Sequence, residues 1–88
     1  MAIEANEVRN DMRAYVEENF LYLHPGLELG DGDQFVTLGI VDSLSFVELV
    51  DEIQDRYGIF IEDVEITEEN LGSIDAITAF VSSKRAAT

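Results

Sequence analysis

Apolar residues recur every three or four positions in three stretches of the chain, and this period predicts three amphipathic helices. The first covers roughly residues 4–22, the second lies between Asp42 and Gly58, and the third begins after Ser73. The positions that define them are Val8, Met12, Tyr15, Val16, Phe20 and Leu23; then Phe46, Leu49, Val50, Ile53 and Tyr57; then Ile74, Ile77, Phe80 and Val81. We expect these stripes to face one shared core.

Residues with strong positional preferences mark the ends of these helices. Pro25 ends the first, because a proline disfavours helical backbone in the residue before it. The Asp42 carboxylate can accept hydrogen bonds from the first-turn amides of the second helix, and Gly58 supplies a left-handed stop. Ser73 caps the last helix.

The long connection from Leu27 to Val41 combines turn-forming residues with six apolar ones. The apolar residues are Leu27, Leu29, Phe35, Val36, Leu38 and Ile40. A structureless connection of this length is uncommon in a compact domain, so we expect it to lie over the bundle. A short helical turn is expected near residues 33–38.

The connection after Gly58 carries two further local signals. Ile59-Phe60-Ile61 has the composition of a strand but no partner strand, so we interpret it as a loop that inserts apolar anchors. Thr67 followed by acidic residues predicts one short helix ending before Gly72. The pattern therefore predicts an all-α fold, a small bundle of three main helices and one short helix with a long first loop.

Size and charge limit the classes of function. At 88 residues, the chain is expected to form a single domain, 1–88, with an ordered core of about residues 4–84 and to act as a monomer. Its net charge of −14 disfavours nucleic acid and anionic membrane and favours basic protein partners. The chain has no cysteine, no basic leader and no long apolar run. We therefore expect a cytoplasmic protein.

The polar side of the second helix has two interpretations. It carries Glu48, Asp51, Glu52 and Asp55, with Leu44 and Val47 projecting beside them. Such a surface could dock a basic partner. It could equally be a solvated face with two ordinary exposed apolar residues.

Catalysis by the chain itself is not indicated. His24, the only histidine, lies next to Pro25 in a loop, and the sequence around Ser43 lacks the G-x-S-x-G elbow of serine hydrolases. We expect no catalytic residues.

A calcium loop is also not indicated. Asp31, Asp33 and Asp42 match three positions of such a loop, but Val36 stands where its sharp turn requires glycine. We expect no metal site.

Ser43 is open to two interpretations from the residues alone. At a helix N-terminus, amides and the helix dipole favour an added phosphate, so the hydroxyl could be modified there. It could also be a neutral first-turn residue beside the Asp42 cap.

A family resemblance favours modification. Asp42-Ser43-Leu44, followed by Val47-Glu48-Leu49-Val50 and closed by Tyr57-Gly58-Ile59, resembles the signature of acyl and aminoacyl carrier proteins. The resemblance spans nearly the whole chain. It implies a bundle whose first loop delivers Ser43 to an exposed end, where Ser43 carries 4′-phosphopantetheine. It also implies that Asp42 lies near a magnesium ion during transfer of that group.

The resemblance further implies a carrier without catalytic activity, which holds acyl or aminoacyl groups as thioesters. Its partners would be a phosphopantetheinyl transferase, an acyl- or aminoacyl-loading ligase and downstream synthases or transferases. The residues expected to contact them are Leu44, Val47, Glu48 and Asp51.

Two features differ from the commonest fatty-acid carriers. Ile40 and Val41 separate Gly39 from Asp42, where the fatty-acid carrier pattern has one residue. Residues 68–74 are also unlike the Thr-Thr-Val ending that is usual in that pattern. Both resemble free-standing carriers of specialised pathways. The alternative is an acidic adaptor that presents its second helix to a basic partner without a prosthetic group.

Overall fold

A computed structural model describes residues 5–87, and within this range every regular element is helical. The elements are α1 (Ala5–Asn19), the 3₁₀ turn η1 (Leu21–Leu23), α2 (Ser43–Tyr57), the 3₁₀ turn η2 (Asp63–Glu65), α3 (Glu68–Leu71) and α4 (Ile74–Ala87). The predicted all-α bundle of three main helices and one short helix is confirmed. Residue 4, where the first helix was expected to begin, lies outside the described residues.

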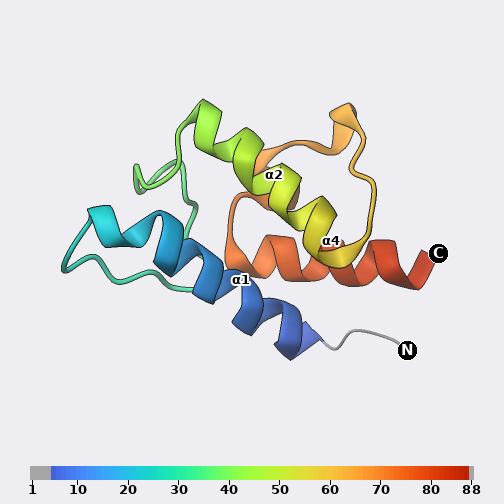
Figure 1. Cartoon of the computed structure of the whole chain (residues 1–88), viewed down its shortest axis with the longest axis horizontal. Helices are drawn as coiled ribbons and strands as arrows, with labels where there is room; N and C mark the ends of the chain where they lie inside the picture. The colour runs from blue at the N-terminus through green and yellow to red at the C-terminus, as the bar shows by residue number, and fades with distance from the viewer. Residues whose placement is uncertain (1–4, 88) are drawn as a thin grey trace.

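Buried residues of the three long helices form one core, with α1 packed against α4. In Figure 1, α2 runs alongside α1 and slants toward α4. The core residues of these helices are Val8, Met12 and Val16 from α1; Leu49, Val50, Ile53 and Tyr57 from α2; and Ile74, Ile77 and Val81 from α4. All ten of these positions follow from the helical period. The predicted stripes therefore do face one core.

The end of α1 differs from the sequence prediction. α1 stops at Asn19, and Leu21–Leu23 tighten into η1. Leu23 consequently leaves the stripe and is 64% exposed, so its predicted core position is wrong.

The long first loop lies over the bundle as predicted. Leu29, Phe35 and Ile40 are buried in the common core. Arg13 on α1 donates a hydrogen bond to the Leu29 carbonyl oxygen at 2.9 Å. Near residues 33–38, where a short helical turn was expected, the Leu38 N–H donates to the Gln34 carbonyl oxygen at 3.0 Å, which is the spacing of a single helical turn. The turn assigned over residues 35–39 leaves Val36 exposed.

The segment after Gly58 inserts fewer anchors than predicted. Ile61 is buried and Ile59 is partly buried, but Phe60 is 72% exposed. The Ile61 N–H donates to the Gln54 side-chain oxygen at 2.8 Å, which ties the segment to α2. Ile59 and Ile61 face the core while Phe60 between them faces solvent, an alternation typical of extended backbone.

The predicted caps of α2, α3 and α4 are confirmed, whereas α1 ends before the expected stop at Pro25. Gly58 adopts the left-handed conformation at φ +62°. The Thr67 hydroxyl accepts from the Asn70 N–H at 3.2 Å, and the Ser73 hydroxyl accepts from the Ala76 N–H at 3.0 Å. These caps fix where α3 and α4 begin.

Candidate functional site

Asp42 and Ser43 form the start of α2. Asp42 has extended backbone, and its carboxylate accepts a hydrogen bond from the Ser45 N–H at 2.8 Å. This bond is the main reason why the pKa of Asp42 lies below its usual value, with the Ser45 hydroxyl adding to it. The predicted N-cap is confirmed, and Ser43 follows it as the first helical residue, exposed to solvent.

Contacts at two points of the long loop fix the position of Ser43. Ile40 is 6% exposed and Val41 is 2% exposed, so the chain is anchored immediately before Asp42. The Phe35 N–H donates to the Gly72 carbonyl oxygen at 2.8 Å, which ties the same loop to the segment before α4. Both residues between Gly39 and Asp42 are thus core residues, a role that the sequence comparison with fatty-acid carriers did not reveal.

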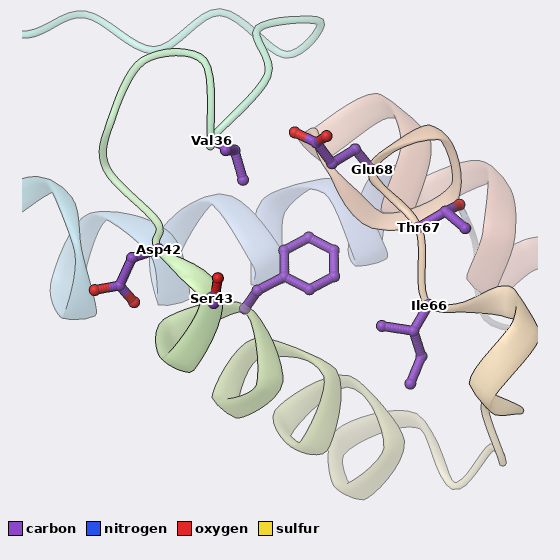
Figure 2. Close-up of a pocket in the computed structure, with 7 residues that line it drawn as sticks. Val36, Asp42, Ser43, Ile66, Thr67 and Glu68 are labelled. Atoms are coloured by element: carbon purple, nitrogen blue, oxygen red, sulfur yellow. The ribbon is translucent and has the colours of Figure 1, made fainter.

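A pocket of about 440 Å³ opens beside Ser43. Its lining comes from the long loop, the first turn of α2 and the segment entering α3: Val36, Asp42, Ser43, Phe46, Ile66, Thr67 and Glu68. Figure 2 shows Ser43 at one side of the pocket, with Ile66 and Thr67 across from it. Sequence reasoning did not place Val36 or residues 66–68 at this site, because these residues come near α2 only when the chain folds.

Phe46 was predicted to be a core residue, but it is only partly buried. It packs against the core and also lines the pocket. Its position one turn after Asp42 places it at the edge of the bundle, where the opening beside Ser43 begins. Phe46 therefore belongs to the wall of the site as much as to the core.

The expected partner-binding residues lie together on an exposed face of α2. Leu44, Val47, Glu48 and Asp51 are spaced i, i+3, i+4 and i+7, which places them on one side of a helix. Leu44 is 71% exposed and Val47 is 55% exposed. The face thus combines two apolar side chains with two carboxylates, directly after Ser43.

Asp31 and His24, for which no metal-binding or catalytic role was expected, make contacts that hold the fold together. Asp31 forms ion pairs with Arg9 and Arg13, which hold the long loop to α1 and lower the pKa of Asp31. The His24 N–H donates to the Leu21 carbonyl oxygen at 2.9 Å and closes η1.

The comparison with known protein families assigns the class of protein. The model of the family described as "phosphopantetheine attachment site" matches residues 13–81. The chain belongs to this family, whose members are carrier domains that attach 4′-phosphopantetheine covalently and interact with modifying and synthase enzymes. No curated protein matches the chain.

The residues present at the start of α2 fit such a group. An exposed serine stands at the N-terminus of a 15-residue helix, where first-turn amides and the dipole favour a phosphate. The pocket beside it has apolar walls from Val36, Phe46 and Ile66.

Across residues 5–87, no helix has the length and hydropathy needed to cross a membrane.

Proposed function

We propose that Ser43 is the attachment residue and that the chain is a discrete carrier of acyl or aminoacyl groups in a specialised biosynthetic pathway. The observation that carries this proposal is the combination of an exposed, capped Ser43 with a family match across residues 13–81. When bound, the phosphopantetheine arm supplies a terminal thiol that holds cargo as a thioester. Residues 1–88 would act as one monomeric domain in the cytoplasm, without catalysis of their own.

In the attachment step, the Ser43 oxygen forms a bond to the phosphorus of the phosphopantetheine half of coenzyme A. The bond from that phosphorus to the adenosine 3′,5′-bisphosphate half breaks, and the hydroxyl proton leaves to a base of the transferase. Asp42 is proposed to lie near the magnesium ion of that transient complex. Ser43 then remains as a phosphodiester on the first turn of α2.

The proposed partners are a phosphopantetheinyl transferase, an acyl- or aminoacyl-loading ligase and a downstream synthase or transferase. Leu44 and Val47 offer apolar contacts to them, while Glu48 and Asp51 attract basic surfaces. The net charge of −14 would speed encounters with such surfaces.

Intact mass spectrometry tests the proposal. The protein is incubated with coenzyme A, magnesium and a promiscuous phosphopantetheinyl transferase, and we expect a gain of one phosphopantetheinyl group. A protein that gains no mass, yet still binds basic partners through α2, would instead be an acidic adaptor.

A further inference from the structure

The pocket beside Ser43 is acidic as well as apolar. Among its lining residues, Asp42 and Glu68 are charged and none is basic. Its volume of about 440 Å³ lies within the range of roughly 300–1,000 Å³ that is common for small-molecule sites. A ligand that suits this pocket therefore combines an apolar part with a neutral or positive group.

Two polar side chains of the lining are already used by the fold. The Asp42 carboxylate accepts from the Ser45 N–H at 2.8 Å, and the Thr67 hydroxyl accepts from the Asn70 N–H at 3.2 Å. The Glu68 carboxylate, by contrast, has no hydrogen-bond or ion-pair partner among the described residues 5–87. Glu68 therefore brings a negative charge to the pocket that the fold itself does not use.

Backbone contacts hold Glu68 beside the pocket. It is the first residue of α3, and its carbonyl oxygen accepts from the Gly72 N–H at 2.8 Å. The Gly72 carbonyl oxygen accepts in turn from the Phe35 N–H of the long loop, also at 2.8 Å. Figure 2 shows the Glu68 side chain extending toward Val36 of that loop. The backbone of Glu68 is thus fixed, while its side chain stays exposed to solvent and able to meet a ligand.

A carboxylate beside apolar walls discriminates between classes of cargo. A fully apolar cargo that covers Glu68 removes water from the charge and returns no hydrogen bond, which costs free energy. A negatively charged cargo is repelled by Glu68 and by the net charge of −14. A protonated amine instead forms a charge-assisted hydrogen bond with the carboxylate.

We propose that Glu68 binds the protonated amine of an aminoacyl cargo, which makes the aminoacyl class, rather than the plain acyl class, the cargo of this carrier. This inference rests on the proposed function, which leaves both classes open. Because Ser43 itself lines the pocket, an arm attached to its oxygen begins at the edge of the pocket. The cargo end would fold back into it, with the carbon chain against Phe46 and Ile66 and the amine at Glu68.

Nuclear magnetic resonance spectroscopy of the loaded protein tests the proposal. A promiscuous phosphopantetheinyl transferase attaches the arm from β-alanyl or butyryl analogues of coenzyme A in which an amide replaces the thioester, so that the cargo stays attached. The two cargoes differ only in their last group, an ammonium or a methyl. The backbone amide chemical shifts of Val36, Phe46 and residues 66–68 are compared with those of the protein that carries the unloaded arm.

In the wild type, we expect the β-alanyl cargo to shift these amides at least about twofold more than the butyryl cargo, because only the ammonium can pair with a partly exposed carboxylate. This excess should shrink as salt is added, because salt screens the pair. Glu68→Gln should reduce the excess by about threefold or more, since it removes the charge and keeps the shape of the side chain.

Glu69→Gln is the matched control, because Glu69 is the next residue of α3, is also exposed and does not line the pocket. Circular dichroism confirms that each variant is folded. Equal shifts from the two cargoes in the wild type, or equal effects of Glu68→Gln and Glu69→Gln, would overturn the role of Glu68. A wild-type protein that accepts no arm would instead overturn the proposed function, so the two failures are distinguishable.

Discussion

The backbone N–H of Phe35 donates a hydrogen bond to the carbonyl oxygen of Gly72 at 2.8 Å. The bond joins two loops that are distant in sequence, one leading to Ser43 and the other to α4. A Cβ atom at Gly72 would collide with the backbone of Glu68 and with the Gln34 side-chain oxygen. The chain therefore needs a glycine here, chiefly because the backbone of Glu68 in α3 leaves no room for a side chain.

Gly72→Ala should destabilise the domain by about 1–3 kcal/mol, because α3 or the long loop must shift to make room. Gly32→Ala is the control, since a Cβ there would make only ordinary contact with Asp75 at 3.7 Å. Urea unfolding of both variants measures the difference. Equal stability of the two variants would show that Gly72 has room for a side chain beside Glu68.

Ile53→Ala should cost about 2–5 kcal/mol of unfolding free energy, because Ile53 is fully buried between the helices. Phe46→Ala should cost less, since its ring is only partly buried and borders the pocket. Leu44→Ala, on the exposed face of α2, should change stability by about 0.5 kcal/mol at most. A larger loss for Phe46→Ala than for Ile53→Ala would contradict this description of the pocket wall.

Acid should weaken the attachment of the long loop. Arg13 and Arg9 lower the pKa of Asp31 in the folded state. A carboxylate with a lowered folded pKa contributes stability above its unfolded pKa, near 4, and that contribution is lost as pH falls through the folded pKa. Asp31→Asn should thus melt at a lower temperature than wild type at pH 7, and the difference should shrink below about pH 4.

Thermal melts from pH 7 to pH 2 measure this difference, with Glu18→Gln as a control from the exposed side of α1. Comparing each variant with wild type at the same pH separates the Asp31 contribution from the general relief of repulsion among the acidic residues. A constant difference between Asp31→Asn and wild type across the whole range would show that the ion pairs do not stabilise the fold.

The exposed face of α2 can be tested with the same transferase. Glu48→Lys and Asp51→Lys should slow association, and this effect should shrink at higher salt because charges are screened over about 8–10 Å. Val47→Ala should mainly speed dissociation, at both salt concentrations. Unchanged association and dissociation rates in all three variants would remove α2 as a docking surface.

The fold could largely be predicted because local signals agree with the tertiary structure. The helical period gives the core residues of all three helices, and Asp42, Gly58, Thr67 and Ser73 mark helix ends by their own chemistry. Phe60 was misplaced because local propensity does not show which side of the segment faces the core; the structure buries Ile61 and leaves Phe60 exposed.

The candidate site was predictable only in part. Ser43 and Asp42 could be located from a short motif and a cap. The wall formed by Val36, Ile66 and Glu68 could not, because these residues meet only when the long loop and the segment before α3 come together. Non-local contacts of this kind leave no period in the sequence.

Ser43 is proposed to carry the arm, and Ser45 offers the sharpest comparison because it lies two residues away on the same first turn of α2. Ser43→Ala and Ser45→Ala are each incubated with coenzyme A, magnesium and the transferase, and their intact masses are measured beside wild type. We expect Ser45→Ala and wild type to gain one phosphopantetheinyl group and Ser43→Ala, folded by circular dichroism, to gain none. A phosphopantetheinyl mass gain in Ser43→Ala would contradict the assignment.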